Sequence, residues 1–136
     1  VYQVARDFGS NDKPAQIFAG ARSADRLYFT EECKDIAKMH IATDDGSAGF
    51  SGRVTDALRD YLETLDAETL AKTEFYNCGP EPMIHAAEAV QREFVEASQM
   101  FSAIDYTTKC GVGICGACAS PDGRRICVDG PFINTR

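Results

Sequence analysis

Four cysteines near the end of the chain have the residue type and spacing to bind a redox cofactor. They are Cys110, Cys115, Cys118 and Cys127. Their pattern, C-x4-C-x2-C…C, is typical of a plant-type [2Fe–2S] cluster, which transfers electrons. Glycines are interleaved with the first three cysteines, at Gly111, Gly113 and Gly116. Because glycine lets the backbone approach closely, amides of this loop could hydrogen-bond to the sulfurs and help set the reduction potential.

Zinc binding, disulfide formation and inert burial are less favoured roles for these cysteines. Zinc sites are typically built from C-x2-C pairs, and only Cys115 and Cys118 form one here. A disulfide framework is typical of small secreted scaffolds, which the rest of the chain does not resemble. Inert burial would not account for four cysteines within 18 residues with glycines between them. The sequence therefore favours an iron–sulfur cluster.

The fourth cysteine is expected to return to the loop on a short strand. A turn is predicted at Pro121–Gly123, and the run Arg125–Val128, which contains Cys127, follows it. Such a run after a turn is typical of a strand.

The composition excludes some classes of function. The chain has 136 residues, enough for one domain or one domain with a small appendage. Its net charge of −7 argues against non-specific nucleic-acid binding. No apolar run is long enough to cross a bilayer, and no N-terminal secretion signal is visible. Six cysteines without such a signal predict a reducing, cytoplasmic location.

The chain shows no constellation of the kind that catalyses hydrolysis. No Ser/His/Asp pattern or pair of carboxylates stands out, so we predict no catalytic residue. The two histidines, His40 in a predicted strand and His85 in a predicted helix, are interpreted as structural. Asp105 is interpreted as a turn or surface carboxylate.

Strands and helices alternate up to about residue 100. Helical segments are predicted at 1–8, 30–38, 54–65 and 82–97, strands at 16–19, 39–43 and 73–78, and a turn at 9–14. Thr30 is expected to cap the second helix. The inner face of the last helix is predicted to hold Met83, Ala86, Ala87, Val90, Phe94 and Ala97. The alternation predicts an α/β fold with a parallel sheet, whose ligands bind beyond the carboxyl ends of the strands.

Polar, glycine-rich loops follow three of the predicted strands. The candidate nucleotide-binding residues in them are Gly20, Ala21, Arg22, Asp44, Asp45, Gly46, Ser47, Cys78, Gly79, Pro80, Glu81 and Met83. Backbone amides and the N-terminus of the helix at Pro82 could face phosphates, and the guanidinium of Arg22 could pair with a phosphate or ribose. Ordinary turns of an α/β protein are the alternative for each loop.

Three segments, in this order, carry a resemblance to a known family. Thr43–Ser47, Cys78–Met83 and the cysteine loop resemble the electron-transfer subunit of dihydroorotate dehydrogenase, in the ferredoxin–NADP reductase superfamily. The resemblance covers nearly the whole chain. It implies a Rossmann-like pyridine-nucleotide domain over 1–100 and a small, cysteine-rich β domain with a [2Fe–2S] cluster over 101–136. It also implies electrons moving between NAD(H), FAD and the cluster, and to or from a partner flavoprotein.

The resemblance also implies roles for the candidate residues. Cys78, Gly79 and Pro80 would lie near the nicotinamide where it meets the flavin, with the Cys78 thiol a packing contact. Gly20–Arg22 would lie near the adenosine ribose, and Asp44–Ser47 near the nucleotide. NAD is favoured over NADP, although Arg22 could serve a 2′-phosphate. Proton chemistry on dihydroorotate would belong to the partner subunit.

The chain departs from the family pattern at its beginning. The flavin-binding barrel and the first strand of the nucleotide domain, with its glycine-rich loop, are not in the sequence, and the order of the motifs places Val1 inside the helix that would follow that loop. We therefore expect a fragment, a truncated gene product, or a chain whose missing half is supplied separately, with FAD bound by the missing N-terminal portion. We also expect an incomplete nucleotide site and apolar surface that favours a homo- or hetero-oligomer.

Two alternatives stay open at the level of sequence. One is a non-enzymatic iron–sulfur or regulatory module that kept the fold without the flavin domain. The other keeps the reductase architecture but serves a hydrogenase or a sulfide-linked oxidoreductase.

Overall fold

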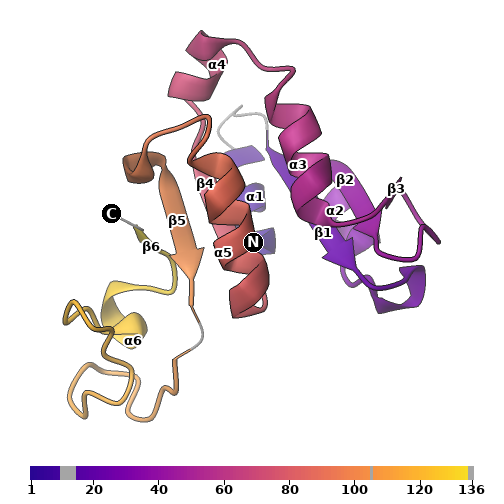
Figure 1. The fold of residues 1–136 in the computed structure, drawn as a ribbon. Coiled ribbons are helices and arrows are strands. Elements are labelled where there is room, and N and C mark those ends of the chain that lie inside the picture. The colour runs from indigo at the N-terminus through magenta and orange to yellow at the C-terminus, as the bar shows by residue number, and fades with distance from the viewer. Residues whose placement is uncertain (10–14, 105, 135–136) are drawn as a thin grey trace. The chain divides into compact units, whose positions relative to one another are not determined.

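The computed structural model describes residues 1–9, 15–104 and 106–134 of the chain. The predicted turn at 9–14, apart from its first residue, and the prediction for Asp105 lie outside the described residues. The chain divides into two compact units, Val1–Thr64 and Leu65–Arg136, whose elements are labelled in Figure 1. The predicted domain boundary at residue 100 stays a prediction.

A parallel sheet forms the centre of the first unit. Its strands are β1 (Gln16–Ala21), β2 (Lys38–Thr43) and β3 (Phe50–Ser51), in the order β1-β2-β3. β1 and β2 are in register from Gln16 opposite Lys38 to Ala21 opposite Thr43. The predicted parallel sheet is confirmed, and only the two-residue β3 was not predicted. The parallel register brings the ends of β1 and β2 to the same edge.

Helices cover both faces of this sheet (Figure 1). They are α1 (Tyr2–Gly9), α2 (Thr30–Lys34) and α3 (Val54–Leu62), with a 3₁₀ turn η1 (Ala24–Arg26) after β1. Ala5 of α1, Ile17 of β1 and Cys33 of α2 form one buried cluster. On α3, Leu58 and Leu62 are buried at the spacing of one helical turn. Burying a leucine side chain stabilises a fold by about 1.5–3 kcal/mol, so a few buried residues are enough to hold the helices on each face of the sheet.

The second predicted helix is shorter than expected, and its predicted cap is wrong. Phe29, with a left-handed φ of 57°, occupies the cap position, and Thr30 is the first helical residue. The helix ends at Lys34 instead of residue 38 because β2 begins at Lys38, whose backbone N–H donates to the Ala15 carbonyl at 3.1 Å. The start of β2 therefore limits the length of α2.

The second unit combines a small mixed sheet with short helices. Its elements are α4 (Ala67–Ala71), β4 (Phe75–Cys78), α5 (Glu81–Gln91), η2 (Ala97–Gln99), β5 (Met100–Ala103), α6 (Ile126–Asp129) and β6 (Ile133–Asn134). β4 and β5 are parallel, and β6 is antiparallel to β5. The predicted strand before Cys78 is confirmed by β4, while α4, β5 and β6 were not predicted. The Asp66 carboxylate caps α4 by accepting a hydrogen bond from the Thr69 N–H at 2.7 Å.

The helix predicted at 82–97 spans only Glu81–Gln91, and its predicted inner face is largely wrong. The buried residues of α5 are Ile84, Glu88, Val90 and Gln91. Only Val90 was predicted. Two of the four are polar, and Gln91 is accommodated because it exchanges two hydrogen bonds with Asn77 of β4, at 2.8 and 2.9 Å. Apolar periodicity does not detect such a polar contact between a helix and a sheet.

The strand predicted around Cys127 is a short helix instead. Of the run Arg125–Val128, only Arg125 forms a β-bridge, with Ala119, and α6 begins at the next residue. The Asp129 carboxylate accepts a hydrogen bond from the Arg125 N–H at 2.7 Å, which favours the helical turn. Within the described ranges, no helix is both long and apolar enough to cross a membrane.

Candidate functional site

The loops that follow β1 and β2 lie against each other in the first unit. The N–H of Asp44 donates to the Ala21 carbonyl at 3.0 Å, and that of Asp45 to the Arg22 carbonyl at 3.1 Å. The Ala24 N–H donates to the Ser47 hydroxyl at 2.8 Å. The structure therefore brings together the predicted sets Gly20–Arg22 and Asp44–Ser47, as expected for the carboxyl ends of parallel strands.

Side chains inside the second of these loops hold its shape. The hydroxyl of Thr43, a fully buried residue, accepts from the Ala48 N–H at 2.9 Å and donates to the Ala48 carbonyl at 2.8 Å. The Asp45 carboxylate accepts from the hydroxyl of Ser47 at 2.6 Å and from its N–H at 2.9 Å. These bonds lower the pKa of Asp45. The loop thus presents an ionised carboxylate in a fixed turn.

Exposed polar groups surround this edge of the sheet. Arg22 is exposed and forms no ion pair with any residue that the structure describes. Gly20 lies so close to the start of α3 that an added Cβ would sit 2.7 Å from the Cβ of Val54. An unpaired guanidinium can bind a phosphate, and the fixed Asp45 carboxylate can accept hydrogen bonds from ribose hydroxyl groups.

The third predicted loop belongs to the second unit. Cys78 ends β4 and is exposed, and Pro80 occupies the cap position of α5. The Met83 N–H donates to the Pro80 carbonyl at 2.9 Å, and the terminal methyl group of Met83 lies beside Gly79. The Glu81 carboxylate lies 3.4 Å from the imidazole of His85. The loop therefore leads directly into a helix N-terminus with the Cys78 thiol accessible.

Buried polar side chains lie behind this loop and were not predicted from the sequence. Asn77, the residue before Cys78, pairs with Gln91 and lies 3.4 Å from the hydroxyl of Ser102. That hydroxyl donates to the Glu88 carboxylate at 2.6 Å. A buried network of this kind specifies one arrangement when all its members are bonded. It fixes the end of β4 against α5 and β5.

The four cysteines of the C-terminal loop form two pairs. The side chain of Cys115 lowers the pKa of Cys110, and the side chain of Cys127 lowers the pKa of Cys118, so the members of each pair are neighbours. Cys118 is buried, Cys127 is partly buried, and the other two are exposed. The order along the chain thus gives one pair from the first two cysteines and one from the last two.

Backbone amides point at these sulfurs. N–H groups, first that of Cys115 and then those of Val112 and Ile114, lower the pKa of the Cys110 thiol to about 6. The backbone N–H of Cys127, together with its thiol, lowers the pKa of Cys118. The pKa of Cys127 itself is raised, chiefly because its thiol is the donor to Cys118. A lowered pKa favours the thiolate, which is the form that binds metal.

The two pairs fit a dinuclear cluster better than a single zinc ion. Each iron of a [2Fe–2S] core takes two thiolates, and two pairs are present. A structural zinc ion needs about four ligands around one point. The donor set and its backbone amides therefore fit the predicted cluster.

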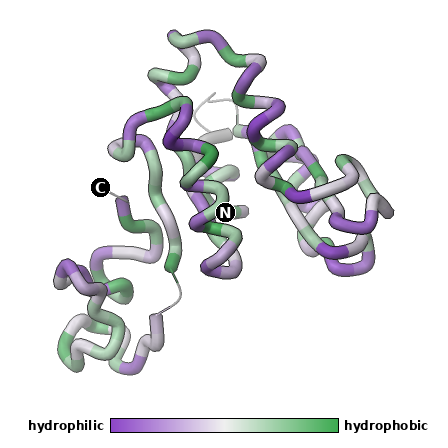
Figure 2. Tube along the Cα trace, in the orientation of Figure 1, coloured by the Kyte–Doolittle hydropathy of each residue, from purple (hydrophilic) through white to green (hydrophobic). Residues whose placement is uncertain are grey.

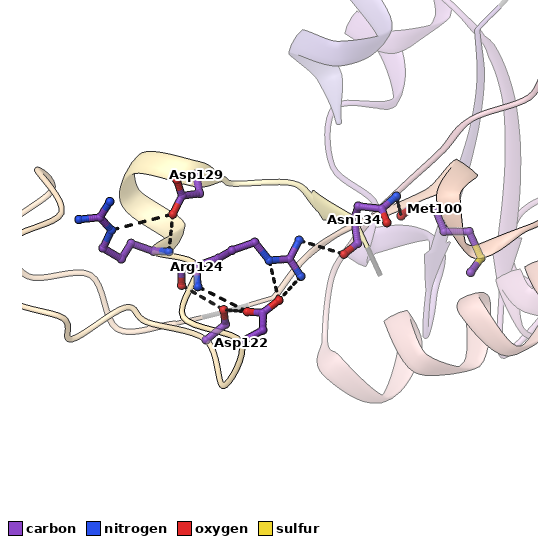
Figure 3. Close-up of polar contacts among 7 residues, drawn as sticks. Met100, Asp122, Arg124, Asp129 and Asn134 are labelled. Atoms are coloured by element: carbon purple, nitrogen blue, oxygen red, sulfur yellow. Dashed lines mark hydrogen bonds and ion pairs between the residues drawn. The ribbon is translucent and has the colours of Figure 1, made fainter. Parts of the chain in front are cut away.

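Arg124 fastens the cysteine loop. Neither this residue nor the adjacent Arg125 was predicted from the sequence to do so. The Arg124 guanidinium binds the Asp122 carboxylate at 2.5 and 2.6 Å and donates to the Asn134 carbonyl at 3.1 Å (Figure 3). This pairing lowers the pKa of Asp122 to about 2. Asn134 in turn donates to the Met100 carbonyl at 3.2 Å. The segment between Cys118 and Cys127 is thereby tied to β5 and β6.

Aliphatic side chains are exposed around the cysteines. Val112 is 64% exposed, Ile114 84% and Val128 52%. Figure 2 shows that hydrophobic residues occur along this loop as well as in the strands. Exposed aliphatic residues gathered at one loop are typical of a surface that contacts another molecule. Their signal in the sequence is the alternation of aliphatic residues with glycine between the first two cysteines.

The fold and the cysteine loop together define a class, the oxidoreductases that combine a pyridine-nucleotide fold with an iron–sulfur cluster. A family model described as the oxidoreductase NAD-binding domain matches residues 1–89, and the chain belongs to this family. A second model, described as the iron–sulfur cluster binding domain of dihydroorotate dehydrogenase B, matches residues 107–136. These matches confirm the resemblance and the predicted iron–sulfur and NAD(H) cofactors. The individual binding residues stay predictions.

Three relatives whose names agree with the second family model are similar to nearly the whole chain. The chain is 36% identical to a probable dihydroorotate dehydrogenase B (NAD(+)) electron transfer subunit of Methanocella arvoryzae, covering 97% of this chain and 48% of the relative. It is 34% identical to the protein with the same name in Archaeoglobus fulgidus, over 98% and 53%. For the Listeria welshimeri subunit the values are 32%, 98% and 50%. The chain spans about half the length of these curated relatives.

A solved structure has a similar fold. It comes from work on flavin-based electron bifurcation by an NADH-dependent reduced ferredoxin–NADP oxidoreductase. It aligns with a TM-score of 0.76 and 30% identity, over 97% of this chain and 46% of the other.

Proposed function

We propose that this chain is the nucleotide- and cluster-binding part of an electron-transfer subunit. In this role it passes electrons between NAD(H), a flavin and a [2Fe–2S] cluster, to or from a partner flavoprotein of the dihydroorotate dehydrogenase type. One observation carries the proposal: a cysteine loop with two thiol pairs follows an NAD-binding fold, in the order of the two family models. The chain contributes binding and orientation, while the cofactors contribute the redox chemistry.

The four loop cysteines are the proposed cluster ligands, with Cys110 and Cys115 on one iron and Cys118 and Cys127 on the other. When bound, a cluster of this type accepts and returns electrons. Backbone amides near the sulfurs, such as the Ile114 N–H at 3.4 Å from the Cys110 sulfur, would stabilise its negative charge.

The nucleotide is proposed to bind at the strand ends. Arg22 and the loop Asp44–Ser47 would hold the adenosine side, where a guanidinium and the fixed Asp45 carboxylate suit phosphate and ribose hydroxyls. Cys78–Met83 would hold the nicotinamide side, where the loop enters the N-terminus of α5. FAD is proposed to bind to polypeptide outside these 136 residues, as the resemblance implies.

The partner is proposed to dock near the cluster. The exposed Val112 and Ile114 flank the first two cysteines and would become buried there. Catalysis on dihydroorotate would take place in the partner, because the described residues that we assign here only bind cofactors. We propose a cytoplasmic location, where NAD(H) is available and thiols stay reduced.

The proposal is tested by anaerobic reconstitution of the whole chain with iron and sulfide. We expect two irons and two sulfides per chain and, after dithionite reduction, a rhombic EPR signal. NADH binding is then followed by the fluorescence of NADH itself, since the chain has no tryptophan to interfere. Bound zinc with no iron uptake would overturn the electron-transfer role. Cluster assembly with no NADH binding, even after the FAD-binding polypeptide is added, would indicate an iron–sulfur module instead.

A second candidate keeps the electron path and changes the partner. The likeness to an NADH-dependent ferredoxin–NADP oxidoreductase favours a ferredoxin-like acceptor. Mixing the reduced, cluster-loaded chain with a dihydroorotate dehydrogenase flavoprotein or with ferredoxin distinguishes the two by the rate at which each partner is reduced.

A further inference from the structure

Arg125 is the residue that precedes α6, and its side chain contacts the cysteine loop. Its guanidinium Nη1 donates to the Gly113 carbonyl at 2.8 Å. The residue is held at its other end by Asp129, whose carboxylate accepts from the Arg125 N–H at 2.7 Å and lies 4.0 Å from its Nε. Arg125 therefore bridges the helical turn that carries Cys127 and the loop between the first two cysteines.

The group that Arg125 contacts is part of a peptide that also contacts a sulfur. The Gly113 carbonyl and the Ile114 N–H belong to the same peptide group. That N–H donates to the Cys110 sulfur at 3.4 Å. Arg125 and the Cys110 sulfur thus bind opposite ends of one planar group. Hydrogen bonds joined in this way polarise each other, so a cation on the carbonyl strengthens the donor on the far side.

Gly113 is packed so that this peptide has little freedom to rotate. Its φ is 76°, in the left-handed region. An added Cβ would lie 2.7 Å from the Val128 side chain and 3.1 Å from Arg125 Nη1, so only glycine fits. Arg125 is thus one wall of the space that encloses Gly113.

We propose that Arg125 is a positioning residue that fixes the Gly113–Ile114 peptide and thereby raises the reduction potential of the cluster. The inference rests on the proposed function, because it requires the cysteines to hold a [2Fe–2S] cluster. In the redox step the oxidised cluster gains one electron from a mediator, which loses one, and no bond is made or broken. The added negative charge is stabilised by the aligned Ile114 N–H and by the Arg125 guanidinium behind it. The reduced cluster is therefore stabilised more than the oxidised cluster.

The test is an EPR-monitored redox titration of the reconstituted full chain and its Arg125→Met variant. We expect the variant to lower the ratio of reduced to oxidised cluster at least tenfold at a fixed solution potential. For a one-electron couple this corresponds to about 59 mV. Arg125→Lys, which keeps the charge and an N–H donor but not the planar guanidinium, should lie between the two. The hyperfine coupling of the Ile114 amide proton should also fall in Arg125→Met, a change that mere loss of stability would not produce.

Arg124→Met is the matched control, because it removes the same charge from the neighbouring residue. The Arg124 guanidinium contacts Asp122 and Asn134. We expect it to shift the potential far less. Equal shifts in the two variants, or no shift in Arg125→Met, would overturn the inference. If Arg125→Met takes up no iron, Arg125→Gln, which keeps an N–H donor without the charge, decides in the same way. Failure of the unmodified chain to bind a cluster is a different result, which overturns the proposed function.

Discussion

The strand-end loops of the first unit and the cysteine loop of the second are stabilised in different ways. The first are aligned by backbone hydrogen bonds that continue a parallel ladder, such as that from Asp44 to Ala21. The second has almost no regular structure and is held by long side chains, with Arg124 bound to Asn134 and Arg125 to Gly113. A site built on strand ends follows from the fold, whereas a site built on a loop depends on residues outside its own motif.

The largest expected effect comes from the cysteine pairs. Cys118→Ser removes the buried member of the proposed ligand set, so iron uptake during reconstitution should fall from two per chain to near zero. The fold of the first unit should not change, because the cysteine loop belongs to the second unit. Iron and sulfide analysis with circular dichroism checks both statements.

Cys78→Ser is the matched control for this experiment. Cys78 is an exposed cysteine that ends β4 and lies outside the four-cysteine motif. Its replacement should leave the iron content at two per chain. Equal iron loss in both variants would contradict the assignment of the ligands.

The next effect concerns the packing of the first unit. Leu62→Ala truncates a side chain that is 1% exposed at the end of α3, and it should cost about 2–5 kcal/mol of unfolding free energy. Hydrogen exchange should show faster exchange of the β1 and β2 amides. The iron content should stay the same, since the cysteine loop is fastened within the other unit. Loss of iron in Leu62→Ala would show that the two regions are not independent.

A smaller cost is expected in the second unit. Gln91→Ala removes both bonds between Gln91 and the half-buried Asn77 side chain, which keeps only its 3.4 Å contact with Ser102, and an amide that loses its partners costs about 1–3 kcal/mol. Urea unfolding measures the loss. Arg92→Ala, at the exposed next position, is the control and should change stability by less than about 0.5 kcal/mol. Equal costs for the two variants would show that the network does not stabilise this loop.

The contrast between the two regions also accounts for what the sequence could predict. The strands of the first unit were predicted because parallel strands are apolar runs bounded by turns, as in the segment 16–21. The cysteine motif indicated a cluster because its ligand spacing reflects the chemistry directly. Neither inference required long-range contacts.

The wrong predictions arose where contacts between different elements determine the structure. The inner face of α5 was wrong because Glu88 and Gln91 are buried through polar partners on other elements. The strand around Cys127 was wrong because the Asp129 side chain favours a helical turn there. Arg124 and Arg125 were not recognised because their partners lie about ten residues away in sequence, and charged residues are ordinarily exposed. Long-range polar contacts are the part of the structure that periodicity does not contain.

The smallest expected effect is a dependence of the stability of the first unit on pH. His40 of β2 stacks on Phe18 with ring centres 4.4 Å apart, and its Nε2 lies 2.8 Å from the Gln16 side-chain oxygen. Burial, and then the charge of Lys38, lower the pKa of His40 below its ordinary value of 6.5. Between pH 6.5 and the lower folded-state pKa, the unfolded chain therefore binds more protons than the folded chain.

Stability should accordingly be greatest above about pH 6.5 and should decline as the pH falls through this value towards the folded-state pKa of His40. Thermal unfolding between about pH 7.5 and 5.5 measures the slope, in a range where most carboxylates stay ionised. The unfolding is followed by the NMR signals of β1 and β2, because the Cys110 thiol of the second unit, with a pKa of about 6, titrates in the same range. His40→Gln should flatten it. His85→Gln, which changes the other histidine of the chain, on the exposed side of α5, should leave it unchanged. A slope that survives in His40→Gln would mean that the imidazole stacked on Phe18 is not the titrating group, and that the contrast between a charge-dependent sheet and a charge-dependent cysteine loop must rest on other residues.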